Sequence, residues 1–153
     1  MEIRKVNVED AVLLRKLAHE CKPLDVHTPY TYWVVCNFFG DGCFILQDNR
    51  KAVGYIMTLL KGDCLFIWQI GILEAYRGKK HSRALLMAAE QYAREKGLEK
   101  MLVSIAPENQ NSYHAFHQYC KGRNILIERN GEVKIEDTLD DITEHEYIYE
   151  MTL

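Results

Sequence analysis

One stretch of the sequence, residues 64–97, restricts the fold more than any other part of the chain. It begins with an apolar run rich in aromatic and β-branched residues, 64–73, which is typical of a buried strand. A basic turn with one glycine, 77–82, follows, and then a helical pattern that stops at Gly97. A strand that leads through such a turn into a helix can bind an anion, because the first helical turn has free backbone N–H groups.

Capping residues define the elements before this stretch. Residues 2–6 alternate in the manner of a first strand, and Asn7 with Asp10 forms a capping pattern for a helix that ends near Cys21. Thr28 and Pro29 are a cap and first residue for a second helix through residue 39, although the content of valine and aromatic residues there also permits a strand.

Turn residues define the remaining elements. We expect a meander of three strands over residues 43–46, 52–60 and 64–73, with polar turns between them. After the long helix come a buried strand at 100–105, a loop, and a helix that runs to about residue 119. The polar segment 122–141 contains Asn130 and Gly131, which predict a turn between short strands. Residues 144–153 predict a final strand.

Length and composition limit the class of protein. A chain of 153 residues with 48% hydrophobic and 27% charged residues predicts a single globular domain over residues 1–153. The net charge of −3 argues against a nucleic-acid partner. No apolar run reaches the length of a membrane span, and the first residues lack the apolar segment of a signal peptide. Five cysteines without a Cys-x-x-Cys pattern favour a reduced, cytoplasmic setting.

The basic turn is also compatible with an ordinary solvated surface loop, but together with its flanking elements it resembles the acyl-CoA pyrophosphate-binding motif of the GNAT N-acetyltransferases. The family pattern is Arg/Gln-x-x-Gly-x-Gly/Ala, and this chain has Arg77, Lys80 and Ser82 at the three defined positions. Lys80 departs from the family, since it stands where the first glycine belongs. The resemblance implies that acetyl-CoA is bound by the residues Arg77, Gly78, Lys79, Lys80, His81 and Ser82.

The order of the expected elements also matches the GNAT family across nearly the whole chain. The resemblance implies an α/β fold with a mixed, mostly antiparallel central sheet flanked by helices. It also implies that the strands at 64–73 and 100–105 splay apart to form an acyl-CoA cleft. The implied cofactor contacts beyond the basic turn are Gln69, Ile70, Gly71, Ile72, Asn109, Ser112 and Phe116.

Four separate blocks resemble a narrower group, the diaminobutyrate acetyltransferases of ectoine biosynthesis. They are residues 24–32, 66–70, 105–109 with Ser112 and Phe116, and more loosely 144–149. His27 replaces an asparagine of that group, and the tail region is shorter. The resemblance implies transfer of an acetyl group to a primary amine of a small diamino acid such as diaminobutyrate. The implied substrate-binding residues are Asp25, Tyr30, Tyr32 and Trp68.

The chemistry of acetyl transfer suggests roles for particular side chains. A primary ammonium must lose a proton before it attacks a thioester, since an alkylamine has a pKa of about 10. Asp25 and Glu146 are candidates to pair with an ammonium, and Trp68 to line the pocket. A backbone N–H near residues 70–72 would stabilise the oxyanion. Many GNAT enzymes have a tyrosine acid where this chain has Phe116, so Tyr113, Tyr30 and Tyr32 are the candidate replacements.

Each of these side chains also has a structural interpretation. Asp25 suits a capping or loop residue, Trp68 a core residue and Glu146 an exposed strand residue. Tyr30 and Tyr32, two residues apart, cannot share one helical face, so at most one of them would reach the site.

Further features of the sequence are less specific. His114 and His117 have the spacing of metal ligands but no third partner, so no metal is expected. Residues 90–96 of the long helix, which include Glu90 and Arg94, suit a solvated face. Two other functions stay open, namely a GNAT enzyme for another small amine and a non-catalytic acyl-CoA-binding regulatory protein. A homodimer also stays open.

Overall fold

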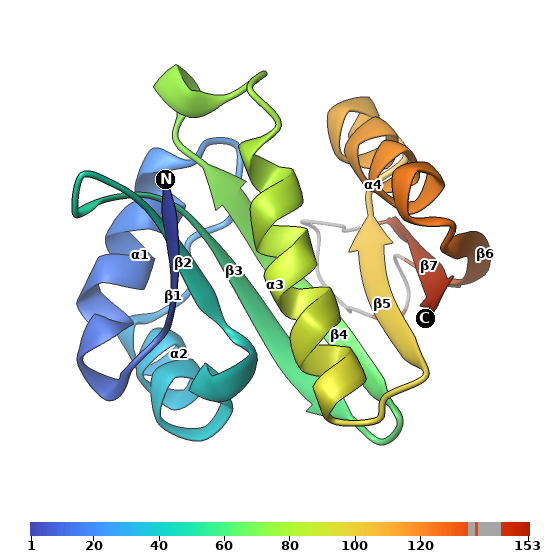
Figure 1. The fold of residues 1–153 in the computed structure, drawn as a ribbon, viewed down its shortest axis with the longest axis horizontal. Coiled ribbons are helices and arrows are strands. Elements are labelled where there is room, and N and C mark those ends of the chain that lie inside the picture. Colours follow the sequence, from blue (N-terminus) through green and yellow to red (C-terminus); the bar gives the residue numbers. More distant parts are fainter. Residues whose placement is uncertain (135–136, 138–144) are drawn as a thin grey trace.

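The computed structural model describes residues 1–134, 137 and 145–153 of the chain. Figure 1 shows the described elements, which follow in the order β1 (Glu2–Lys5), α1 (Ala11–Glu20), α2 (Pro29–Val34), β2 (Phe44–Asp48), β3 (Lys51–Lys61), β4 (Cys64–Ile72), α3 (His81–Glu95), β5 (Lys100–Ile105), α4 (Gln110–Arg123), β6 (Leu126–Val133) and β7 (Glu146–Thr152). Among the helices of these described residues, none has both the length and the apolar character that a bilayer crossing requires.

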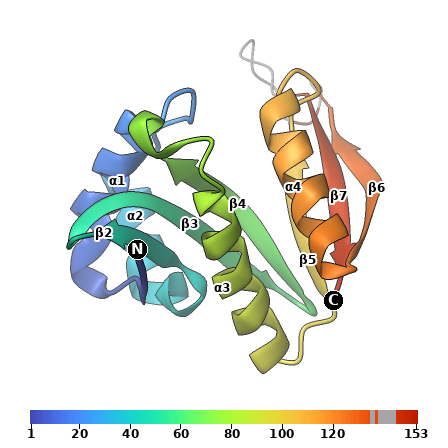
Figure 2. The same cartoon turned by 45° about the horizontal axis from the view of Figure 1, so that its top comes forward.

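The seven strands form one sheet in the order β1-β2-β3-β4-β5-β7-β6. The β4–β5 pair is parallel, and every other pair is antiparallel. Helices α1 and α2 cover one face of the sheet, and α3 and α4 cover the other (Figures 1 and 2). A separate hydrophobic core fills the space under each pair of helices. The expected fold, a mixed and mostly antiparallel sheet flanked by helices, is confirmed.

The two central strands separate soon after they begin to pair. Strand β4 pairs with β5 over Cys64–Ile67 and Lys100–Val103, and its later residues pair with β3 alone. Figure 2 shows β4 and β5 diverging, so that β5 to β7 and α4 stand apart from the rest of the sheet. The β4 backbone groups beyond Ile67 that would have bonded to β5 therefore face the gap between the strands.

A β-bulge at Trp68 accompanies this separation. On β3, Met57 is opposite Gln69 and Thr58 is opposite Ile67, so Trp68 has no partner in the register. One extra residue reverses the faces to which later side chains point. Leu65 and Ile67 before the bulge belong to the core under α3 and α4, and after it the even-numbered Ile70 and Ile72 pack there. Trp68 packs against the opposite core, under α1 and α2.

The predicted caps form in the first part of the chain. Asn7 accepts a hydrogen bond from the Glu9 N–H (2.9 Å), and Asp10 accepts one from the Asn7 N–H (2.9 Å). Arg4 binds both oxygens of Asp10, at 2.7 and 2.8 Å. Thr28 caps α2 and Pro29 is its first residue, so the helical interpretation of residues 29–39 was right. The helix continues as a π-helical turn, Val35–Phe39, instead of a regular α-helix.

The C-terminal part differs from the prediction at one turn. Asn130 and Gly131 lie within the continuous strand β6, so the predicted turn between short strands was wrong. The pairing of β6 with β7 is irregular between Arg129 and Glu132, and Gly131 within this stretch has a φ of 121°, which favours glycine. Strand β7 forms over Glu146–Thr152, close to the prediction, while the expected first residue, Glu144, lies outside the described residues.

Glu90 corrects the prediction of a solvated helix face. Its side chain is buried, with 1% of its surface exposed, between α3 and α4. Tyr119 donates a hydrogen bond to its carboxylate, Arg94 donates one at 2.8 Å, and Arg123 donates two at 2.9 and 3.1 Å. The charged residues around Glu90 suggested a solvated face, but its two partners on α4 are far away in the sequence and meet it only in the folded chain. This cluster joins the helix packed on β4 to the helix packed beyond β5.

The carboxylate of Glu90 should make stability depend on pH in acid. Burial opposes its ionisation, but the hydrogen bonds from Arg123, Tyr119 and Arg94 outweigh burial and lower its pKa from an ordinary 4.5 to about 2. Its contribution is present above the unfolded pKa and is lost as pH falls through the folded one. Glu90→Gln removes the charge that both arginines bind. Because both arginines reach solvent and can be hydrated there, the loss in the free energy of unfolding should be limited to about 2–3 kcal/mol at pH 7.

Urea unfolding at pH 7 and at several values between pH 5 and 2 measures this effect. The difference between the wild type and Glu90→Gln should shrink as pH falls, whereas exposed Glu95→Gln on the same helix should cost less than about 0.5 kcal/mol. A Glu90→Gln cost at pH 7 as small as that of Glu95→Gln would contradict the structural role given to the cluster.

Candidate active site

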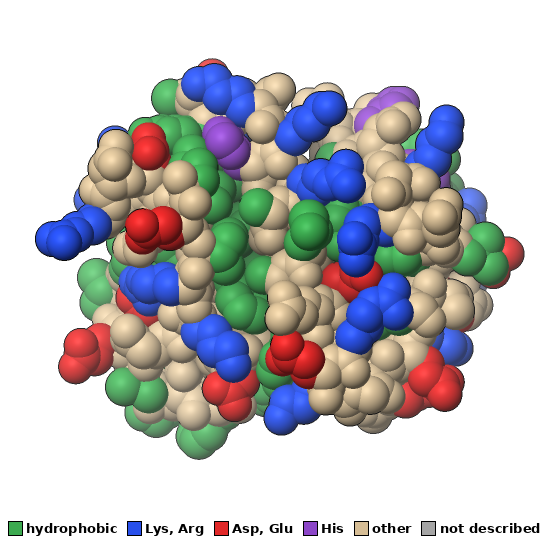
Figure 3. All heavy atoms as spheres, viewed as in Figure 1, with side chains coloured by type: hydrophobic (Ala, Val, Ile, Leu, Met, Phe, Trp, Pro, Cys, Tyr) green, Lys and Arg blue, Asp and Glu red, His purple; other side chains and the backbone are tan. Residues whose placement is uncertain are grey.

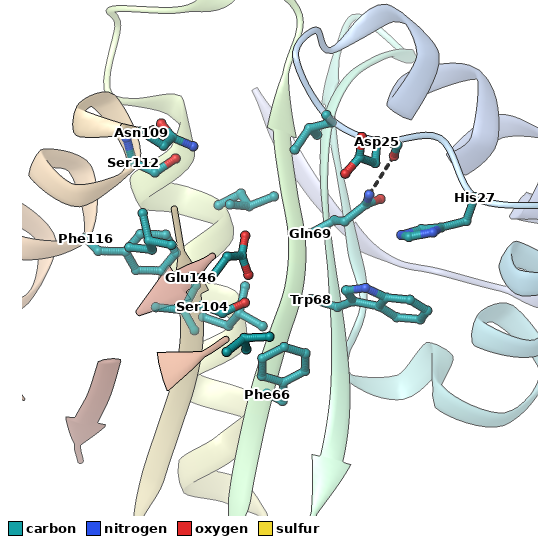
Figure 4. Close-up of a pocket in the computed structure, with 16 residues that line it drawn as sticks. Asp25, His27, Phe66, Trp68, Gln69, Ser104, Asn109, Ser112, Phe116 and Glu146 are labelled. Atoms are coloured by element: carbon teal, nitrogen blue, oxygen red, sulfur yellow. Dashed lines mark hydrogen bonds between the residues drawn. The ribbon is translucent and has the colours of Figure 1, made fainter. Parts of the chain in front are cut away.

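A cleft of about 340 Å³ lies where β4 and β5 separate. Its walls come from the loop before α2, from both strands, from the start of α4 and from the first residue of β7. Figure 4 shows the cleft, and the labelled residues that line it are Asp25, His27, Phe66, Trp68, Gln69, Ser104, Asn109, Ser112, Phe116 and Glu146. The splayed cleft that the sequence predicted therefore exists, and residues far apart in the chain meet in it.

The cleft has two different sides. Asp25, His27 and Trp68 lie on the side of β3, while Asn109, Phe116 and their neighbours on α4 lie on the side of β5 (Figure 4). Trp68 packs with the core under α1 and α2, and Phe116 belongs to the core under α3 and α4. A cleft bounded by both cores reaches from one face of the sheet to the other, so two ligands can approach each other from opposite faces.

A chain of hydrogen bonds fixes the Asp25 loop to β4. The Tyr55 hydroxyl donates to the Gln69 side-chain oxygen (2.9 Å), and the Gln69 side-chain nitrogen donates to the Asp25 backbone carbonyl (2.8 Å). Burial raises the pKa of Tyr55, so its hydroxyl keeps the proton that it donates. Gln69 lines the cleft with its side chain turned to the Asp25 loop, and its contact with the cofactor stays a prediction.

Gly71 allows the same loop to lie against β4. A Cβ atom at this position would stand 2.9 Å from Leu24 Cδ1 and 3.0 Å from Cys21 Cβ, closer than side chains normally approach. Gly71 and Ile72 are not among the described residues that line the cleft. Ile70 lines the cleft, and the cofactor contacts expected from the backbone at Gly71 and Ile72 stay predictions.

The charge of the cleft is negative. Among the described residues that line it, Asp25, Glu146 and His27 are ionisable, and none is a lysine or an arginine. Glu146, which could have been an exposed strand residue, points into the cleft from the start of β7 (Figure 4). Low-dielectric walls strengthen the field of two carboxylates, so the cleft favours a cationic ligand.

The basic turn before α3 has the backbone that the motif requires. Gly78 has a φ of 74° and Lys80 a φ of 61°, both in the left-handed region. Lys80 therefore occupies a conformation that favours glycine, at the position where the family pattern has glycine. No side chain caps the N-terminus of α3, so its first N–H groups are free to bind an anion. Figure 3 shows Lys and Arg side chains gathered over α3 and α4 on this face.

Arg77 was predicted to contact the cofactor, but its guanidinium is bound to backbone carbonyl groups. Its Nε donates to the Ile72 carbonyl (3.0 Å), and its terminal nitrogen donates to the Lys22 carbonyl. Arg77 therefore ties the end of β4 to the segment that follows α1. Its guanidinium orders the turn, while the backbone of the turn remains available to a pyrophosphate.

Asn109, the cap of α4, and two residues of the helix line the opposite wall. Asn109 caps the helix by accepting a hydrogen bond from the Ser112 N–H (3.1 Å). Ser112 and Phe116 are four residues apart and share one helical face, which looks into the cleft. The structure therefore brings these three predicted cofactor residues to the cleft.

The predicted tyrosines lie elsewhere. Tyr30 is 71% exposed and stacks on Trp33 outside the cleft, with ring centroids 6.1 Å apart. Tyr32 is fully buried, and its hydroxyl accepts the His27 N–H (3.3 Å). Tyr113 follows Ser112 by one residue and so points about 100° away around the helix, where it packs on His117 and Tyr149. The proposed proton-donor role of Tyr30, Tyr32 and Tyr113 and the substrate contacts of Tyr30 and Tyr32 are corrected.

Sequence reasoning missed two polar residues of the cleft. Ser104 is the one hydroxyl side chain in the apolar strand β5, which was a usable signal. His27 was noted only as a departure from a family pattern. Its ring lies 4.8 Å from the Trp68 ring, and it lines the cleft beside Asp25.

The fold is thus a splayed mixed sheet whose cleft lies where β4 and β5 separate. Residues 12–121 match the family model described as the Acetyltransferase (GNAT) family. The chain therefore belongs to the GNAT acetyltransferase family, and its expected activity as an N-acetyltransferase and its use of acetyl-CoA are confirmed.

Several diaminobutyrate acetyltransferases are similar to this chain in sequence or in structure. The chain is 28% identical over 131 residues to the L-2,4-diaminobutyric acid acetyltransferase of Halalkalibacterium halodurans, covering 82% of this chain and 68% of that protein. It is 27% identical over 134 residues to the enzyme of the same name from Streptomyces coelicolor, with coverage of 84% and 79%. Its structure resembles diaminobutyrate acetyltransferase EctA from Paenibacillus lautus, solved with L-2,4-diaminobutyric acid and coenzyme A, with a TM-score of 0.89, 22% identity and coverage of 99% and 93%.

Lys80→Gly should relieve the strain at the start of α3. The left-handed conformation costs a lysine about 1–2 kcal/mol, and the greater freedom of glycine in the unfolded chain offsets part of the gain. We expect the free energy of unfolding to rise by about 0.5–1 kcal/mol. The affinity for coenzyme A should change less than about tenfold, because lost charge and gained backbone freedom act in opposite directions.

Urea unfolding and isothermal titration with coenzyme A measure the two effects. Lys79→Gly is the matched control, since Lys79 is exposed and is not among the residues with positive φ. It should lower stability instead. Loss of stability in Lys80→Gly would contradict the strain, and a gain of about tenfold or more in affinity would show that Lys80 impairs the turn.

Proposed function

We propose that this acetyltransferase transfers the acetyl group of acetyl-CoA to a primary amine of 2,4-diaminobutyrate. The observation that carries the proposal is the pair of carboxylates, Asp25 and Glu146, in a described cleft wall without lysine or arginine. Diaminobutyrate has two amino groups, which suit two carboxylates. The activity of the similar enzymes from Halalkalibacterium halodurans and Streptomyces coelicolor supports the same acceptor.

The acceptor would bind on the side of the cleft formed by Asp25 and Trp68. A charge-assisted hydrogen bond from an ammonium to Asp25 would hold one end. The exposed part of the Trp68 ring would contact the aliphatic chain or an ammonium. Glu146 approaches from the opposite side of the cleft (Figure 4), so the second amine would lie between the two walls, near the unpaired backbone of β4.

The donor would bind on the other side of the cleft. Acetyl-CoA supplies an acetyl thioester, and its sulfur leaves as a thiol. The free N–H groups at the start of α3 suit the pyrophosphate, and Asn109, Ser112 and Phe116 would form the wall along the acyl arm. Backbone N–H groups of β4 beyond the bulge, which have no partner on β5, would stabilise the negative charge on the carbonyl oxygen.

Proton transfer must use the groups that the cleft contains. The carboxylates of Asp25 and Glu146 can accept the proton that the attacking amine loses, directly or through one water molecule. With the tyrosines away from the cleft, Ser104 and Ser112 are the hydroxyl groups among its described lining residues. We propose that one of them hydrogen-bonds the leaving sulfur. A homodimer, a cytoplasmic location and the lack of a nucleic-acid partner remain predictions from the sequence.

A panel of amines tests the proposed acceptor. The purified chain is incubated with acetyl-CoA and diaminobutyrate, 2-aminobutyrate or 4-aminobutyrate, and released thiol is measured against a reaction without amine. Because each monoamine leaves one carboxylate of the cleft unpaired, diaminobutyrate should be at least about tenfold more efficient. Mass spectrometry should detect one added acetyl group. Equal or greater efficiency with a monoamine would refute the proposal.

Asp25→Asn tests the main acceptor contact. The change preserves shape and the backbone bond to Gln69 but removes the charge, so kcat/KM for diaminobutyrate should fall roughly ten- to a hundredfold. Coenzyme A affinity should be unchanged, since Asp25 lies on the opposite side of the cleft from α4. Asp41→Asn, at an exposed position that does not line the cleft, is the control and should behave as wild type. Unchanged turnover in Asp25→Asn would make Asp25 a loop residue only.

A further inference from the structure

The charges of the cleft and of the proposed acceptor do not balance without a further cation. Diaminobutyrate at neutral pH carries two ammonium groups and one carboxylate. Asp25 and Glu146 complement the ammonium groups, but the acceptor carboxylate meets no lysine or arginine among the described lining residues. Burying a carboxylate without a partner is costly. Within the described part of the cleft, His27 is the side chain that can supply a positive charge.

The main chain of His27 is held on both sides. Its N–H donates to the Tyr32 hydroxyl (3.3 Å), and its carbonyl accepts from Arg15 Nε (3.4 Å). The imidazole packs on Trp68 with an angle of 40° between the rings. None of the described residues forms a hydrogen bond with its ring nitrogens, which leaves both for a ligand. His27 is thus a fixed residue with an uncommitted polar group in the cleft.

We propose that His27 is a specificity-determining residue that binds the carboxylate of the acceptor as an imidazolium. This inference rests on the proposed function, since it concerns the same acceptor. The carboxylate would lie near the ring nitrogens of His27, with the adjacent carbon chain along Trp68 and one ammonium toward Asp25. A diamine without the carboxylate would lose this contact and keep the others.

The charge of an imidazole changes within the range from about pH 5 to 8, so this recognition should depend on pH. The charged and titratable groups that surround His27 are Asp25 on its own loop, Arg15 on α1, Tyr32 on α2 and Glu146 across the cleft. Trp68 on β4 is neutral. As pH rises and the imidazolium loses its proton, the attraction for the acceptor carboxylate should weaken.

A matched pair of acceptors isolates the contact. Diaminobutyrate and 1,3-diaminopropane have the same two amines with the same spacing, and differ by the carboxylate. The ratio of their kcat/KM values is measured with acetyl-CoA at pH 6, 7 and 8 for the wild type, His27→Ala and His27→Asn. His19→Asn, a histidine of α1 that does not line the cleft, is the control. Comparing the ratios cancels effects on acetyl-CoA and much of the titration of the amines.

In the wild type the ratio should fall by about tenfold from pH 6 to pH 8, through a rise in KM for diaminobutyrate. In His27→Ala it should be about tenfold lower at pH 6 and no longer depend on pH. His27→Asn should retain part of the preference, also without pH dependence, because an amide donates a neutral hydrogen bond at any pH. His19→Asn should match the wild type.

Two results would overturn the proposal. Equal losses with both acceptors in His27→Ala would show that the residue only supports Trp68, and a wild-type ratio that does not change with pH would exclude an imidazolium contact. Failure of the proposed function is distinct from these. A folded chain that binds coenzyme A and acetylates diaminopropane but not diaminobutyrate would refute the acceptor, and the role of His27 with it.

Discussion

The separation of β4 from β5 is the constraint on which the site depends. A parallel pair normally satisfies the backbone of both strands along their length, and here it ends after Ile67. The bulge at Trp68 reverses the alternation of β4 at this point and turns the indole toward the core under α1 and α2. The separation therefore leaves backbone groups of β4 without a partner on β5, and the bulge places an aromatic ring in the wall of the cleft.

A split sheet needs support on both sides of the split. The Glu90 cluster joins α3 to α4 across the split, and the hydrogen bonds of Tyr55 and Gln69 hold the Asp25 loop on β4. The bond from Gln69 fixes the loop that carries Asp25 by its backbone carbonyl, so the Asp25 side chain remains free for a ligand.

The sequence predicted the elements and much of the cleft because both depend on local patterns. Periodicity and caps located the strands and helices. The resemblance and the chemistry of acetyl transfer singled out Asp25, Trp68 and Glu146, and all three line the cleft. Apart from the turn expected at Asn130 and Gly131, which lie within β6, the predictions that were wrong concern the direction of side chains. Residues 30, 32 and 113 point away from the cleft, Arg77 binds carbonyl groups, and Glu90 is buried. Contacts with residues distant in the sequence determine those directions, and spacing along the chain does not predict such contacts.

A crystal structure of the chain with coenzyme A and diaminobutyrate tests the central claim most directly, namely that the cleft receives donor and acceptor from opposite faces of the sheet. We expect the coenzyme pyrophosphate at the start of α3 and its thiol beside the unpaired backbone of β4. One acceptor amine should point at that thiol, and the other should be within hydrogen-bond distance of Asp25 or Glu146. An acceptor bound outside the gap between β4 and β5, or on the same face as the coenzyme, would contradict the account.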